Sequence, residues 1–229
     1  MAILIVISSD QEWVVARDRF KNVTVERSPY GEWFNTSISA IETPLIFFHG
    51  RWGKIAAAAS AQWAISSFQP EVLLNLCTCG GFEGEIERGQ LILVNRTVVY
   101  DIVEQMLDDE DADDYYGSEI DLGWLKSPYP QRVTETLMVS ADRDIVPGDI
   151  PRLKRDYGAV AGDWESASIA WVARHNDVRC LILRGVSDLV GDEGSEAYGN
   201  VAHFEEGSRI VLNELFDHLS EWLERAGIS

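Results

Sequence analysis

The stretch Ala2-Ile3-Leu4-Ile5-Val6-Ile7 is a continuous run of apolar, mostly β-branched residues. A strand with both faces buried has this pattern, because neither face needs polar side chains. Two later runs share the pattern, EVLLNL at 71–76 and RCLILRGV at 179–186. Helical patterns separate these runs, so strands and helices alternate along the chain. This order predicts an α/β sandwich in which a mixed sheet is covered on both faces.

Other segments fit the same architecture. The alanine-rich stretch 53–68 predicts a helix that Pro70 ends, and apolar residues spaced between 204 and 223 predict a long amphipathic C-terminal helix. Asp163 can cap the start of a helix that reaches about His175. We also expect two or three strands within 23–49, a long strand at 91–100, and short strands at 136–140 and 159–162. No repeat or linker divides the chain, so 1–229 is predicted to be a single domain.

The chain is acidic, with 38 Asp and Glu against 19 Lys and Arg and a net charge of −19. Residues 101–121 hold ten of these acids and no base. We interpret 101–130 as an acidic loop or lid inserted into the domain, because so long an irregular segment is uncommon in a compact domain. Nucleic acid and anionic membranes are not expected as partners, since both attract basic surfaces.

The compartment is suggested by what the chain contains. An apolar content of 46% fits a globular protein, yet no run approaches the roughly 18 apolar residues that span a bilayer. The first apolar run has no basic residue before it and acids after it, so no signal peptide is expected. Three cysteines, an odd and low number, favour a reducing, cytoplasmic setting over a disulfide framework.

Ligands of open α/β sheets bind beyond the carboxyl ends of the strands. This rule selects five segments: 8–12, 77–81, 141–145, 187–188 and, at a helix start, 163–165. Four of them contain an acid, and Thr78 supplies a hydroxyl in the remaining one. Gly80, followed by a second glycine, lets the backbone approach a ligand closely. The expected site is therefore rich in carboxylates.

Each candidate acid has two interpretations at this point. Both Glu12 and Glu165 can be acids in the first turn of a helix, where the helix dipole stabilises a negative charge. Alternatively, Glu12 is a general base and Glu165 accepts hydrogen bonds from two sugar hydroxyls. Asp188 is either a cap or turn residue or a proton donor in a partly desolvated cleft. Arg184 lies in an apolar strand and needs a carboxylate partner, either Glu165 or an acid near the strand end. Trp164 is expected against a ligand ring.

Several site classes have little support. The Cys77-Thr78-Cys79 pair has one other cysteine and no nearby histidine, and the four histidines lack ligand spacing, so no metal site is expected. Neither GxGxxG nor a P-loop lysine follows a strand, and GxSxG is absent from the sequence. No metal or organic cofactor is therefore expected.

Five motifs stand in order along the chain: ISSDQE at 7–12, GKIAAA at 53–58, NLCTCGG at 75–81, DWESA at 163–167 and RGVSD at 184–188. Together they resemble the nucleoside phosphorylase and nucleosidase superfamily, most closely the 5′-methylthioadenosine/S-adenosylhomocysteine nucleosidases. The resemblance implies a single-domain three-layer α/β/α sandwich with a central mixed β-sheet. It also implies a small purine nucleoside as the ligand and a second copy of the chain as the partner, in a homodimer.

The resemblance implies roles for individual residues. Asp188, supported by Ser187, would protonate the purine, Glu12 would deprotonate water, and Glu165 would hold the ribose hydroxyls. The implied substrate-binding set is Glu165, Trp164, Thr78, Gly80, Ile145, Arg184 and Ser187. Two positions depart from the family pattern, because Trp164 replaces a methionine and Asp144 replaces a purine-stacking phenylalanine.

The expected activity is hydrolysis of the N-ribosidic bond of 5′-methylthioadenosine or S-adenosylhomocysteine, releasing the base. Three alternatives stay open: phosphorolysis by a purine nucleoside phosphorylase, a futalosine-type nucleosidase, and a nucleoside-binding protein without turnover. Phosphorolysis needs an anion site, yet the loops 8–12 and 77–81 contain no Lys or Arg. Arg51 and Arg143 are the residues that could provide one.

Overall fold

The computed structural model describes residues 2–39, 41–103, 106 and 115–228. Its strands form one sheet in the order β11-β10-β6-β8-β9-β5-β1-β4-β3-β2, and β7 pairs with β6. The strands are β1 (Ile3–Ile7), β2 (Glu26–Arg27), β3 (Glu32–Thr36), β4 (Leu45–His49), β5 (Val72–Phe82), β6 (Leu91–Val99), β7 (Ser118–Glu119), β8 (Val133–Ser140), β9 (Ala161–Asp163), β10 (Arg179–Gly191) and β11 (Gly194–Ser195).

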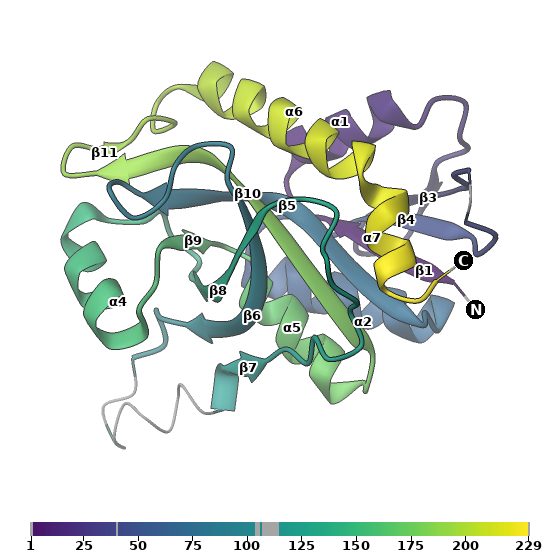
Figure 1. Cartoon of the computed structure of the whole chain (residues 1–229), viewed down its shortest axis with the longest axis horizontal. Helices are drawn as coiled ribbons and strands as arrows, with labels where there is room; N and C mark the ends of the chain where they lie inside the picture. The colour runs from purple at the N-terminus through teal and green to yellow at the C-terminus, as the bar shows by residue number, and fades with distance from the viewer. Residues whose placement is uncertain (1, 40, 104–105, 107–114, 229) are drawn as a thin grey trace.

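Helices cover both faces of this sheet (Figure 1). They are α1 (Asp10–Arg19), α2 (Lys54–Phe68), η1 (Pro147–Asp149), α4 (Ile150–Tyr157), α5 (Ser166–His175), α6 (Val201–Asp217) and α7 (Leu219–Arg225). The side chains of α1, α6 and α7 belong to one hydrophobic cluster, and those of α2 and α5 belong to another. Because β1 pairs in parallel with β4 and β5 while β3 pairs antiparallel with β4, the sheet is mixed, as predicted.

The first strand lies at the centre of the fold. All five of its residues are fully buried. Ile3, Ile5 and Ile7 face the α1 and α6 side, whereas Leu4 and Val6 face the α2 and α5 side. Alternating side chains of one strand therefore contribute to both cores, which explains why the run has no polar residue.

Part of the sheet closes on itself. β10 pairs with both β5 and β6, and β8 and β9 complete the connection from β6 back to β5. A third apolar cluster, which includes Phe82, Tyr100 and Leu153, packs beside this ring under α4. The sequence did not predict this closure, because β10 pairs with strands that lie about 90 to 110 residues earlier, and such pairing leaves no local pattern.

Two strands are longer than the sequence predicts. The expected loop at 77–81 is part of β5, which continues to Phe82, and β10 continues past Asp188 to Gly191. The extensions pair with each other, and Gly80 also pairs with Gly162 of β9. These long-range pairs keep both segments extended where glycine and polar residues suggested a strand end.

Three other expectations need correction. The single C-terminal helix is divided at His218 into α6 and α7. The helix expected from Asp163 begins at Ser166, although the Asp163 carboxylate still accepts a hydrogen bond from the Ser166 N–H at 3.2 Å. Within the expected acidic loop, 104–105 and 107–114 lie outside the described residues, and β7 lies in the part that follows.

No helix in the described parts of the chain has the length and apolarity to cross a membrane.

Candidate active site

The expected site residues meet in one cavity of about 590 Å³. Eight of the nine line it: Glu12, Thr78, Gly80, Ile145, Trp164, Glu165, Ser187 and Asp188. The ninth, Arg184, lies beneath the cavity and is completely buried. The residues that the carboxyl-end rule selected therefore lie together, because β1, β5 and β10 run parallel and present them at one edge.

Glu12 is held at the start of α1. Ser9 caps this helix, and its N–H donates to Glu12 Oε2 at 2.9 Å while its hydroxyl accepts from the Glu12 N–H. The other carboxylate oxygen accepts from the Thr78 N–H at 2.6 Å and from the Thr78 hydroxyl at 2.8 Å. Glu12 thus completes a capping box and also reaches β5, so it lies buried and oriented rather than solvated.

Asp188 lies next to an irregularity in β10. The register with β5 shifts between Val186 and Asp188, which leaves Ser187 as the extra residue of a bulge. The Ser187 hydroxyl donates to Asp188 Oδ1 at 2.6 Å, and the Ser195 hydroxyl donates to Asp188 Oδ2. Both carboxyl oxygens are therefore positioned by serines, one from the bulge and one from β11.

Arg184 forms its close ion pair with Asp163. Arg184 Nε lies 2.8 Å from Asp163 Oδ2, whereas Arg184 Nη2 lies 3.9 Å from Glu165 Oε2. The guanidinium also donates to Asn75 Oδ1 at 2.7 Å and to the Ser166 hydroxyl at 2.9 Å. Of the two partners that the sequence left open, the acid near the strand end is the closer one. Arg184 therefore organises the cavity floor from below.

Glu165 occupies a buried position that favours its neutral form. Burial raises its pKa from 4.5 to about 8, and the nearby Asp163 carboxylate adds to this, while Arg184 and the Gly53 N–H oppose it. That N–H donates to Glu165 Oε1 at 3.0 Å from the start of α2. A protonated carboxyl group both donates and accepts a hydrogen bond, which suits a pair of neighbouring hydroxyls.

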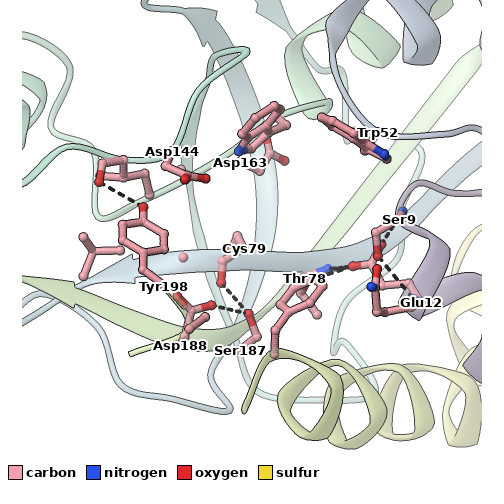
Figure 2. Close-up of a pocket in the computed structure, with 18 of the residues that line it drawn as sticks. Ser9, Glu12, Trp52, Thr78, Cys79, Asp144, Asp163, Ser187, Asp188 and Tyr198 are labelled. Atoms are coloured by element: carbon pink, nitrogen blue, oxygen red, sulfur yellow. Dashed lines mark hydrogen bonds between the residues drawn. The ribbon is translucent and has the colours of Figure 1, made fainter. Parts of the chain in front are cut away.

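The cavity has two distinguishable ends. Figure 2 shows Glu12 and Trp52 toward one end, and Asp188, Asp144 and Tyr198 toward the other. At the Glu12 end, the rings of Trp52 and Trp164 meet edge to face with centroids 5.4 Å apart. The Tyr198 hydroxyl donates to the Ile145 carbonyl at 2.9 Å.

Sequence reasoning missed Trp52, Tyr198 and Phe204 as residues of the cavity. Tyr198 follows β10 and β11, and the carboxyl-end rule would have reached it if β10 had been extended to Gly191. Trp52 precedes α2 and Phe204 lies in α6. No local pattern assigns these two aromatic residues to the cavity, because the packing of their elements brings them there.

The cavity is lined by carboxylates. Its described lining contains six acidic residues and no Lys, Arg or His: Asp10, Glu12, Asp144, Asp163, Glu165 and Asp188. Arg51 pairs with Asp10 at 2.9 Å and Arg143 pairs with Asp149 at 2.7 Å, and neither arginine lines the cavity. Among the described residues, no group of three or more His, Cys, Asp or Glu side chains has the arrangement of a metal site.

The phosphorylase superfamily model matches residues 2–146, more than half of the chain. This chain belongs to the phosphorylase superfamily. A 5′-methylthioadenosine/S-adenosylhomocysteine nucleosidase of Thermotoga maritima is 30% identical over 156 residues, which cover 67% of this chain and 70% of that protein. The enzyme of the same name from Maridesulfovibrio salexigens is 25% identical over 209 residues, with 86% and 90% covered.

Solved structures of other proteins share the fold of this chain. The 5′-methylthioadenosine/S-adenosylhomocysteine nucleosidase of Campylobacter jejuni has a TM-score of 0.79 and 19% identity, covering 96% of this chain and 99% of that chain. Futalosine hydrolase of Helicobacter pylori has a TM-score of 0.80 and 16% identity, covering 96% and 98%. The expected nucleoside phosphorylase-like α/β fold is thereby confirmed.

Proposed function

We propose that this superfamily member hydrolyses the N-ribosidic bond of a purine nucleoside, with 5′-methylthioadenosine or S-adenosylhomocysteine as the preferred substrate. The observation that carries the proposal is the placement of Glu12 and Asp188 in one cavity, each oriented by its own hydrogen bonds. The relatives named above carry the nucleosidase name, which supports the same reaction.

In the proposed reaction, the two carboxyl groups handle different protons. Asp188 gives a proton to N7 of the purine, so that the base leaves as a neutral molecule when the bond between C1′ and N9 breaks. Water adds to C1′, and Glu12 takes the proton that this water loses. The reaction thus consumes one water and yields the free base and the free sugar. Exchange of protons with solvent then returns both carboxyl groups to their starting states.

Glu165 is proposed to hold the sugar between these two groups. It lines the same cavity, and the Gly53 N–H fixes its carboxyl group by donating a hydrogen bond to Oε1. A carboxyl group fixed in this way can bind the 2′- and 3′-hydroxyls, and holding C1′ in line with the water lowers the entropic cost of the reaction. Thr78, Gly80, Ile145, Trp164 and Ser187 are proposed to complete the substrate contacts, with Arg184 supporting them from below.

Phosphorolysis is the second candidate, because the superfamily takes its name from phosphorylases. A phosphate co-substrate needs positive side chains, and the described cavity lining has none. Arg51 and Arg143, the two residues that could have supplied them, are paired with Asp10 and Asp149. This arrangement favours water as the nucleophile.

One assay separates the candidate functions. The protein is incubated with 5′-methylthioadenosine, S-adenosylhomocysteine, inosine and futalosine, each with and without phosphate, and the released base and sugar are measured. We expect release of adenine from the first two substrates at a rate independent of phosphate. A ribose 1-phosphate product would identify a phosphorylase, and turnover of futalosine alone would identify a futalosine hydrolase. Binding of nucleosides without any turnover would identify a binding protein.

The assigned roles predict the effect of two substitutions. Glu12→Gln and Asp188→Asn each remove a proton-transfer group, so each is expected to lower kcat by about 10²–10⁴-fold. Glu193→Gln and Asp192→Asn are matched controls, because these exposed residues lie outside the cavity lining. Wild-type kcat in both cavity variants would contradict the mechanism, and binding of 5′-methylthioadenosine measured by calorimetry checks that the site is intact.

The proposal extends to assembly and setting. We propose a homodimer, supported by the exposed apolar side chains of Trp52 and Ile55 beside the cavity, and a single domain spanning 1–229, supported by the one sheet that runs from β1 to β11. A cytoplasmic setting is supported by the three cysteines, which are buried free thiols.

A further inference from the structure

Asp144 differs from the other carboxylates of the cavity. Five of the six lining acids have partners: Asp10 pairs with Arg51, Glu12 accepts from Thr78, Asp163 pairs with Arg184, Glu165 accepts from Gly53, and Asp188 accepts from Ser187. Asp144 forms no hydrogen bond or ion pair with the parts of the chain that the structure describes. Its two oxygens are free to accept hydrogen bonds from a ligand.

The neighbouring donors are committed elsewhere. Arg143, next to Asp144 in the chain, pairs with Asp149 at 2.7 Å. The Tyr198 hydroxyl, which lies at the same end of the cavity, donates to the Ile145 carbonyl. Burial raises the pKa of Tyr198, and the nearby Asp144 carboxylate adds to this, so the phenol stays neutral. Neither Arg143 nor Tyr198 therefore uses its donor on Asp144, whose carboxylate stays available to a ligand.

Asp144 lies at the end of the cavity where the base is proposed to bind. A Cβ atom placed on Gly80 would lie 3.1 Å from Ile145 Cδ1 and 3.9 Å from Asp188 Oδ2. The segment that contains Asp144 therefore approaches Gly80 from one side, and the proposed N7 proton donor approaches it from another. Consider a purine stacked over Gly80, between Asp144 and Asp188. The exocyclic group at C6 is next to N7 on the same edge of the purine, so it would lie at the end of the cavity that contains these two acids.

We propose that Asp144 is a specificity-determining residue whose carboxylate accepts a hydrogen bond from the exocyclic amino group of the purine. This proposal rests on the proposed function and adds the group that recognises the base. A charged acceptor gives a stronger hydrogen bond than a neutral one, whereas a base without the amino group loses this bond and leaves the exposed carboxylate of Asp144 to water. The site should therefore select 6-aminopurines over purines that lack the amino group.

A substrate pair isolates this contact. 5′-Methylthioadenosine is compared with its analogue that lacks only the 6-amino group, in the wild type, Asp144→Ala, Asp144→Asn and the control Asp192→Asn. We expect the ratio of the two kcat/KM values to fall by about 10-fold or more in Asp144→Ala, and by less in Asp144→Asn, whose amide oxygen still accepts. Asp192→Asn should keep the wild-type ratio.

A binding measurement keeps this test separate from the proposed function. The Kd values of free adenine and free purine are measured by calorimetry for the same variants, and their ratio should shift as the kinetic ratio does. If no variant turns over any nucleoside but the binding ratio collapses in Asp144→Ala, the proposed hydrolysis fails and the role of Asp144 stands. An unchanged ratio in Asp144→Ala, in turnover or in binding, would overturn the role of Asp144.

Discussion

Glu165 links the protonation of the site to the stability of the fold. Burial raises the pKa of Glu165 from 4.5 to about 8. The unfolded chain loses this proton near pH 4.5, whereas the folded protein keeps it until about pH 8, so the folded state binds more protons across this window. The contribution of Glu165 to the free energy of unfolding therefore declines as pH rises from about 4.5 to 8.

Removing this ionisable group should flatten the pH dependence. We expect Glu165→Gln to lose less unfolding free energy between pH 5 and pH 8 than the wild type, as measured by urea denaturation at both values. Glu193→Gln, an exposed carboxyl group outside the cavity, serves as the control and should follow the wild type. Equal losses in Glu165→Gln and the wild type would show that Glu165 titrates normally in the folded protein.

Arg184 and Asp163 form a buried pair that should fail when one partner is removed. Both side chains are almost completely inaccessible and lie 2.8 Å apart. Arg184→Met leaves the Asp163 charge without its counterion, which is expected to cost about 3–5 kcal/mol of unfolding free energy. The double variant Arg184→Met with Asp163→Asn should recover part of that loss, because no charge is then left unpaired. Urea denaturation of Arg184→Met, Asp163→Asn and the double variant gives the comparison, and additive losses would contradict a direct pair.

At the level of elements, α6 approaches the bulge of β10 through a glycine. A Cβ atom on Gly207 would lie 2.8 Å from the Ser187 carbonyl oxygen and 3.1 Å from Ser187 Cβ. The backbone of β10 cannot yield as a flexible side chain would, so a larger residue must push the helix away from the bulge. The position of Ser187, and through it that of Asp188, thus depends on close contact between the two elements.

Gly207→Ala tests this contact against helix propensity. Alanine is favoured over glycine within a helix by about 1 kcal/mol, so the substitution would stabilise an unconstrained α6. We expect a lower Tm and a lower kcat instead, because the added methyl group displaces Ser187. Gly148→Ala is the matched control, since no atom lies within 4 Å of its added Cβ. A raised Tm with unchanged kcat in Gly207→Ala would show that the helix moves without affecting the site.

The whole molecule exposes apolar surface beside its cavity. Trp52 is 59% exposed and lines the cavity, and Ile55 in the first turn of α2 is 84% exposed. In the proposed homodimer this surface is covered by the second copy. We expect light scattering after gel filtration to give a dimer for the wild type and a monomer for Ile55→Glu. Ile210→Glu, which places the same charge at an exposed site on α6, should remain a dimer; a monomeric wild type would contradict the proposal.

Much of the candidate site could be predicted from sequence because several buried strands are each followed by polar residues. Buried strands give recognisable apolar runs, and parallel strands place the residues that follow them at a common edge. This reasoning brought Glu12, Thr78 and Asp188 to one cavity. It misjudged where β5 and β10 end, since their extensions are stabilised by each other and by β9.

The sequence by itself determined the alternation of strands and helices, the mixed covered sheet and the acids at its edge, because these follow from local apolar patterns and chain order. Only the tertiary structure decided that β10 closes a ring with β6, that Asp163 is the close partner of Arg184, and that Asp144 and Tyr198 share the Asp188 end of the cavity. Such choices depend on contacts between residues far apart in the chain. The free energy of such a contact depends on the two side chains that packing brings together, and a local sequence pattern contains only one of them.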